Sequence, residues 1–224
     1  MQVGVHEGHA IWSAVYDEAP NPLLDLEHRT VTPWLPPLAG RTLIDVACGT
    51  GRWTEYGAAQ GARVFGADFC APMLVRATAG RFARGRYVQA DALRLCFADG
   101  RADLSLCAFA AGYLKSPRTM LAELARITAP GGRVMVTDIH PTALASGWRR
   151  SFRLGDRVYE INNRAHAISG YFSAARELGL VLEHFAEAFF GEPERAVFRS
   201  CGREASFEPM SRIPAIFAAM WRRS

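Results

Sequence analysis

The sequence lacks most features that mark membrane, secreted or metal-dependent proteins. Its longest apolar runs, such as Leu106–Ala111 and Ile213–Trp221, are much shorter than the roughly 20 residues that a membrane helix requires. The first residues, MQVGVHEGHA, show no basic stretch followed by an apolar block, so no secretory signal is expected. The five cysteines include no C-x-x-C pair, which disfavours a zinc ribbon or a disulfide framework. We therefore expect a cytoplasmic protein without a metal site.

Lysine is nearly absent, and the positively charged residues are spread along the whole chain. Lys115 is the only lysine, and arginine supplies the rest of the 26 basic residues, which are scattered among 22 acidic ones. A net charge of +4 and a pI near 9.0 would suit a nucleic-acid partner. However, no run of about five or six like charges occurs, so a solvated surface is the better interpretation.

The remaining composition is that of an ordinary globular domain. Of the 224 residues, 50% are hydrophobic and 21% are charged, which excludes a disordered or fibrous chain. A domain commonly holds about 150 residues, so the length predicts one domain. We expect a helical cap over residues 1–40, a core over 41–141, a hairpin or lid over 142–168, and a final helix with strands over 169–224.

Apolar segments with strand and helix spacing alternate through the core. Strands are predicted at Thr42–Val46, Arg63–Asp68, Tyr87–Gln89, Leu104–Ala108 and Arg133–Asp138. Helices are predicted from near Trp53 to Gly61, over Ala71–Ala79 and through Leu121–Leu124. Strands that alternate with helices of about 10–15 residues imply a mostly parallel sheet with helices on both faces.

The two flanks of the core have other signals. Apolar spacing predicts a helix over His9–Glu18, and Asn21-Pro22 marks the start of another. Gly155-Asp156 predicts a hairpin turn. The last predicted elements are a helix over Ser169–Glu177 and strands over Leu180–Phe185 and Pro214–Trp221. Whether residues 192–210 are ordered is left open.

The loop after the first core strand has the pattern of a cofactor site. In LIDVACGTG, Asp45 ends the strand, and two glycines precede a helix whose N–H groups can approach a ligand. Asp68 ends the second strand, where a carboxylate can accept hydrogen bonds from a ribose diol. A dinucleotide fingerprint would need a small residue where Thr54 stands, and Asp45 would repel a pyrophosphate. The pattern favours an adenosine cofactor with an amino group and a sulfonium over a nicotinamide dinucleotide.

Four segments carry a resemblance to a known family: LIDVACGTGRWT, FGADFCAPML, VQADALRLCFADGRADLSLCAF and ELARITAPGGRVMVTDIHP. In order and spacing they resemble the class I S-adenosylmethionine-dependent methyltransferases, especially the branch with the ubiquinone and menaquinone biosynthesis methyltransferases. The resemblance covers Thr42–Pro141. It implies a Rossmann-like α/β fold with an antiparallel final strand, an N-terminal helical cap and a late hairpin insertion. It also implies S-adenosylmethionine as cofactor.

The resemblance further implies which residues contact this cofactor, all of them near strand ends or in the cap. They are Tyr16, Asp45, Ala47, Gly49, Gly51, Asp68, Phe69, Met73, Asp91, Ala92, Ala108 and Phe109. The residues from Tyr16 to Gly51 in this list would hold the methionine part of the cofactor. The residues from Asp68 to Ala92 would hold its ribose and adenine. Ala108 and Phe109 would lie beneath the transferred methyl group.

The acceptor side of the site is less well defined by the sequence. Methyl transfer depends mainly on alignment of the reactants, and it needs a base only where the acceptor loses a proton. Candidate bases or orienting groups are His140, His166 and Tyr113. Four aromatic residues around the hairpin predict either an apolar lid or packing of the hairpin on the sheet. They are Trp148, Phe152, Tyr159 and Phe172.

We expect methyl transfer to an oxygen or carbon of a phenolic, quinone-like or polyketide-like small molecule. An RNA or other macromolecule methyltransferase is an alternative, although the loop AFAAGYL lacks the Asn/Asp-Pro-Pro-aromatic motif and no Pro-Cys dipeptide occurs. A protein that binds S-adenosylmethionine without transferring its methyl group would keep the same motifs. The expected partner is a small-molecule acceptor, with no nucleic acid and no membrane span, and the expected state is a monomer or homodimer.

Overall fold

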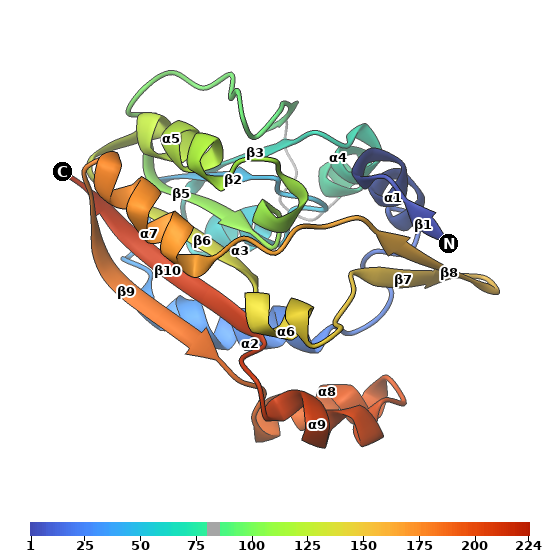
Figure 1. Ribbon diagram of the computed structural model, residues 1–224. Coiled ribbons are helices and arrows are strands. Elements are labelled where there is room, and N and C mark those ends of the chain that lie inside the picture. Colours follow the sequence, from blue (N-terminus) through green and yellow to red (C-terminus); the bar gives the residue numbers. More distant parts are fainter. Residues whose placement is uncertain (80–85) are drawn as a thin grey trace.

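A seven-stranded sheet forms the centre of the computed structural model, which describes residues 1–79 and 86–224 (Figure 1). The strand order is β4-β3-β2-β5-β6-β10-β9. The strands are β2 (Thr42–Val46), β3 (Arg63–Asp68), β4 (Tyr87–Gln89), β5 (Ala102–Ala108), β6 (Thr128–Ile139), β9 (Leu180–Ala188) and β10 (Ile216–Arg223). The first five pair in parallel, and β10 runs antiparallel to both β6 and β9. The predicted mostly parallel sheet with an antiparallel final strand is confirmed.

Helices cover both faces of this sheet. In the central strand β2, Leu43 faces an apolar cluster that includes Val31 and Trp53, whereas its neighbour Ile44 faces a cluster that includes Leu124. Both faces of β2 are therefore buried, as expected for an inner parallel strand. The helices on the Leu43 side are α2 (Pro22–Val31), η1 (Thr32–Trp34) and α3 (Arg52–Ala59). Those on the Ile44 side are α5 (Pro117–Ile127) and α7 (Ile168–Glu177).

Three short helical segments follow the carboxyl ends of parallel strands. They are α4 (Ala71–Ala79) after β3, η2 (Ala111–Tyr113) after β5 and α6 (Pro141–Ala145) after β6. The predicted cap of α2 is present, since the backbone N–H of Leu23 donates to Asn21 Oδ1 at 3.0 Å. No helix in the described parts of the chain is long and apolar enough to cross a membrane.

A second, three-stranded sheet lies beside the first with α1 (Val5–Trp12) packed on it (Figure 1). It consists of β1 (Gln2–Val3), β8 (Arg157–Ile161) and β7 (Ser151–Leu154), and Gly155, at φ +57°, lies in the predicted hairpin turn. The helix predicted over His9–Glu18 was misplaced, because α1 begins at Val5 and ends at Trp12. Gly8 lets α1 pack closely on β8, because a Cβ there would lie 2.7 Å from the side chain of Ile161.

Residues 192–210, whose order the sequence left open, are mostly helical. They form α8 (Glu192–Ser200), η3 (Glu204–Ser206) and α9 (Phe207–Ser211), at the lower end of the molecule in Figure 1. Phe198 and Phe207 bury their rings in a cluster with Leu26 of α2. Arg29 of α2 also donates to both carboxylate oxygens of Glu194, at 2.9 and 3.0 Å. Tertiary contacts thus stabilise helices that are too short to form alone.

Candidate active site

A cavity of about 1440 Å³ opens at the carboxyl ends of the parallel strands. Helix α1, the loops after β2 to β5, residues 146–155 and the α8–α9 segment surround it. The predicted cofactor residues that line it are Tyr16, Ala47, Gly49, Asp68, Phe69, Met73, Asp91, Ala92, Ala108 and Phe109. Asp45 lines a small adjoining pocket that shares Tyr16, Ala47 and Gly49 with the main cavity. The topology therefore gathers these residues at one edge of the sheet, where open α/β sheets bind ligands.

The loop between β2 and α3 contains three residues in the left-handed region, Ala47 at φ +58°, Gly49 at +56° and Gly51 at +95°. A Cβ on Gly49 would meet no atom within 4 Å, so the loop leaves open space there. A Cβ on Gly51 would lie 2.6 Å from the hydroxyl of Tyr87. Of the described residues, Gly51 is the one predicted cofactor residue that lines neither pocket. Its requirement for glycine comes from backbone conformation and packing.

Asp68 is held in place at the end of β3. Its Oδ2 accepts from the N–H of Gly49 at 2.8 Å, and its Oδ1 accepts from the N–H of Cys70 at 2.7 Å. Each carboxylate oxygen has a second lone pair, so the group can still accept two hydroxyl hydrogen bonds. Beside it, Phe69 is 45% exposed and Met73 is only 1% exposed. A polar anchor and an apolar wall for a nucleoside therefore lie next to each other.

Acidic side chains surround the floor of the small pocket. Burial raises the pKa of Asp45 well above its usual value, and the nearby Arg52 guanidinium opposes this shift. Glu27 of α2, which is fully buried, pairs with Arg52 and accepts from the hydroxyl of Thr137 at 2.5 Å. With Asp68 close by, this end of the cavity suits a ligand with positive charge. A sulfonium cofactor with an amino group fits these residues.

A buried ion pair forms the opposite wall. Arg150, directly before β7, is 7% exposed and pairs with Asp138 at the end of β6. Its Nη1 donates to the carbonyl oxygen of Phe109 at 2.8 Å, and Asp138 Oδ2 accepts from the N–H of Gly112 at 2.6 Å. The guanidinium lies 4.5 Å from the ring centroid of Tyr113. Arg150 thus ties the hairpin to the loop after β5, where Phe109 has a φ of +55°.

Sequence reasoning missed this pair, because Arg150 is one of the many arginines that are scattered along the chain. A pattern that couples an arginine before a hairpin to an acid at a strand end has no fixed spacing. Only the fold shows that the two side chains meet.

The three side chains predicted as bases or orienting groups lie in different surroundings. Of them, Tyr113 lines the cavity, and burial raises the pKa of its phenol, which the Arg150 charge opposes. His140 accepts from the N–H of Thr142 at 3.0 Å and donates to Glu187 at 2.7 Å, so it caps α6. His166 donates to the backbone oxygen of Leu114 at 3.0 Å. Among the described residues, neither histidine lines the cavity.

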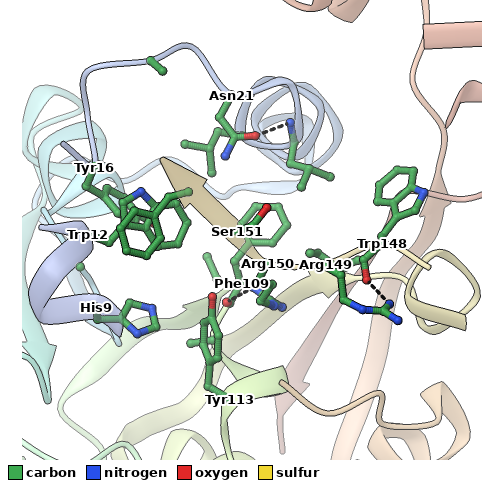
Figure 2. Close-up of a pocket in the computed structure, with 18 of the residues that line it drawn as sticks. His9, Trp12, Tyr16, Asn21, Phe109, Tyr113, Trp148, Arg149, Arg150 and Ser151 are labelled. Carbon is green, nitrogen blue, oxygen red and sulfur yellow. Dashed lines mark hydrogen bonds between the residues drawn. The ribbon is translucent and has the colours of Figure 1, made fainter. Parts of the chain in front are cut away.

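The aromatic residues around the hairpin divide into two groups. Trp148 and Phe152 line the cavity, and Figure 2 shows Trp148 and Trp12 there. Phe152 stacks on Trp12 with ring centroids 5.1 Å apart. Tyr159 stacks behind Phe152 at 5.2 Å, and Phe172 packs against Trp221 on the sheet. Two of the four residues therefore line the cavity, and the other two pack against neighbouring aromatic rings. No cluster of metal-ligating side chains occurs in residues 1–79 and 86–224.

Comparisons with known proteins agree with this geometry. A family model described as a methyltransferase domain matches residues 44–136. The demethylmenaquinone methyltransferase of Thermus thermophilus is 35% identical over 178 residues, which cover 76% of this chain and 77% of that protein. The ubiquinone/menaquinone biosynthesis C-methyltransferase of Bdellovibrio bacteriovorus is 38% identical over 105 residues, and this match spans 45% of each chain.

The fold itself also has solved counterparts. A structure of an S-adenosylmethionine dependent methyltransferase from Mesorhizobium loti matches with a TM-score of 0.71 and 21% identity, over 91% of this chain and 100% of that one. The fold, the residues at the sheet edge and the relatives agree on one family. The chain therefore belongs to the class I S-adenosylmethionine-dependent methyltransferases, enzymes that use S-adenosylmethionine as their methyl donor.

Proposed function

We propose that this enzyme methylates an oxygen or carbon of a phenolic, quinone-like or polyketide-like small molecule. The observation that carries the proposal is the make-up of the large cavity at the carboxyl ends of the strands. Its sheet-loop end carries the carboxyl group of Asp68, with Asp45 in the small adjoining pocket, whereas its hairpin end is aromatic. S-adenosylmethionine would supply an activated methyl group between the two ends.

At the donor end, five of the predicted residues would share the contacts to the cofactor. Asp68 would accept hydrogen bonds from the ribose hydroxyls, while Phe69 and Met73 would pack on the adenine. Gly49 would let the backbone approach the methionine part, because its Cβ position is open. Tyr16, a phenol whose pKa is raised chiefly by burial, would cover this part as a neutral hydrogen-bond donor.

At the acceptor end, apolar walls favour a flat aromatic substrate. Trp148, Phe152, Phe190, Phe198 and Met210 line the cavity there. Aromatic rings bind one another with offset or edge-to-face geometry, which adds to apolar burial. The relatives named for menaquinone and ubiquinone precursors support an acceptor of the quinone class. A reduced naphthoquinone or a substituted phenol is the substrate type that we infer.

A transfer assay tests this proposal. The purified full chain is incubated with S-adenosylmethionine that carries a labelled methyl group and with separate acceptors: 1,4-dihydroxynaphthalenes, catechols, hydroxybenzoates, alkyl amines and tRNA. We expect label only in the hydroxyl-bearing aromatic compounds. Label confined to amines or tRNA would overturn the proposed substrate class. Calorimetry with S-adenosylmethionine and NAD serves as the binding control, and only the first is expected to bind.

A further inference from the structure

We propose that His9, a residue of the N-terminal cap, is the general base of the reaction and removes the proton from a hydroxyl group of the acceptor. This inference rests on the proposed function, because it requires an acceptor with an acidic hydroxyl. His9 projects from α1 into the cavity beside Tyr113 (Figure 2). Its sequence context, an apolar helix before the core, gives no sign of this role.

The hydrogen bonding of His9 leaves one ring nitrogen available. Nδ1 lies 2.8 Å from the backbone oxygen of Val5, and a carbonyl oxygen can only accept, so Nδ1 carries the proton. Nε2 then holds the lone pair in the neutral ring. Within the described chain, no protein group bonds to Nε2. The α1 backbone therefore fixes the tautomer that a general base needs, much as a second group orients a catalytic histidine.

The groups that face His9 keep it neutral. Burial lowers the pKa of His9 below its usual value, and the charges of Arg150 and His6 act in the same direction, whereas the Val5 hydrogen bond and Asp68 oppose them. The ring of Tyr113 lies edge-on to His9 with centroids 4.6 Å apart. A neutral imidazole can accept a proton near pH 7.

The two phenols at this wall, Arg150 and the two histidines predicted from the sequence are poorer bases. Burial raises the pKa of Tyr113 and of Tyr16, so both phenols stay protonated and can only orient the acceptor or donate to it. Arg150 is held by Asp138. His140 and His166 use ring nitrogens in hydrogen bonds outside the cavity. His9 thus combines a free lone pair with access to the acceptor space.

Proton transfer to His9 makes the acceptor nucleophilic. The O–H bond breaks, its proton binds Nε2, and the electron pair left on oxygen forms the bond to the methyl carbon. The pair of the carbon–sulfur bond stays on sulfur, so the products are the methyl ether, S-adenosylhomocysteine and one proton, which leaves from the imidazolium to water. If the ortho carbon attacks instead, that carbon afterwards loses its proton and the oxygen regains one.

Nitrogen NMR of the full chain with labelled histidine tests the geometry without any acceptor. The His9 signals are those missing from the spectrum of His9→Asn. We expect the tautomer protonated at Nδ1 and a pKa below the usual value of about 6.5. A ring protonated at Nε2, or charged at neutral pH, would overturn the proposal.

Kinetics test the role in the reaction. In His9→Asn the side-chain amide can still donate to Val5, but no base remains. With a phenol from the acceptor panel, we expect kcat to fall by about 10²–10⁴-fold at pH values below the acceptor pKa. The deficit should shrink about tenfold per pH unit as the acceptor ionises by itself. The affinity for S-adenosylmethionine, measured by calorimetry, should not change.

A matched control separates this role from a structural one. His184 is exposed on β9 and stacks on Trp34, and neither residue lines the cavity, so His184→Asn should keep the wild-type pH profile. If His9→Asn methylates phenols at the wild-type rate, or with a deficit that does not vary with pH, the role of His9 is refuted while the substrate class stands. If label reaches only amines or tRNA, the proposed function fails and the role of His9 with it.

Discussion

The Arg150–Asp138 pair offers a sharp test of how the hairpin is attached to the sheet. Replacing Arg150 by Met removes the charge but keeps much of the apolar stem. Asp138, only 3% exposed, would then be a buried carboxylate without its cation. Breaking a buried pair from one side costs about 3–5 kcal/mol, because the remaining charge is uncompensated. The lost hydrogen bond to the Phe109 carbonyl adds about 1 kcal/mol.

The expected loss in the free energy of unfolding for Arg150→Met is therefore about 4–6 kcal/mol. For a chain of this size, each kcal/mol shifts the melting temperature by about 2–4 °C. Replacing Asp138 by Asn as well removes the stranded charge, and an amide oxygen can still accept from the N–H of Gly112. The double variant should then be more stable than Arg150→Met alone.

Urea unfolding followed by circular dichroism measures all four members of this double-mutant cycle. Two results would refute the reasoning. One is a loss below about 1 kcal/mol for Arg150→Met, which would place the pair in the range of surface ion pairs. The other is strict additivity of the two substitutions, which would mean that the two groups do not interact.

Three further predictions concern the donor end of the cavity. Asp68→Ala should weaken S-adenosylmethionine binding by about 1–3 kcal/mol through the loss of charge-assisted hydrogen bonds, and unchanged affinity in calorimetry would show that the ribose lies elsewhere. Ala47→Gly should raise the free energy of unfolding by about 1 kcal/mol, since Ala47 has a φ of +58°; a loss of stability in urea unfolding would speak against this strain. Burial raises the pKa of Asp45, so a cationic ligand releases a proton from it on binding, and the affinity should rise as the pH increases above the usual carboxyl range of about 4. This slope should disappear in Asp45→Asn, and a flat wild-type profile would contradict the assignment.

The core of the fold could be predicted because its signals are local. The bounds of β2, β3 and β4 match the predicted ranges, and α4 begins at Ala71 as predicted. The hairpin at Gly155 follows from a turn that glycine favours. The residues at the donor end of the cavity could also be predicted to lie together, because parallel strands bring their carboxyl ends to one edge of the sheet.

The missed elements depend on contacts between distant parts of the chain. Helices α8 and α9 are held by Phe198, Phe207 and the Arg29–Glu194 pair, none of which a short window of sequence reveals. Helix α1 packs on β8 through Gly8, which fits closely against the distant Ile161. The role proposed for His9 likewise depends on the tautomer of its ring and on the cavity, and the spacing of residues in the sequence predicts neither.

The most direct test of the central claim is a crystal structure with S-adenosylhomocysteine bound. The account predicts that both ribose hydroxyls donate to Asp68, that the adenine packs on Phe69 and Met73, and that the sulfur faces Phe109 on the side of the aromatic wall. His9 Nε2 should then border the space directly beyond the sulfur. A ligand whose ribose lies away from Asp68, or whose sulfur points away from the hairpin end, would contradict it.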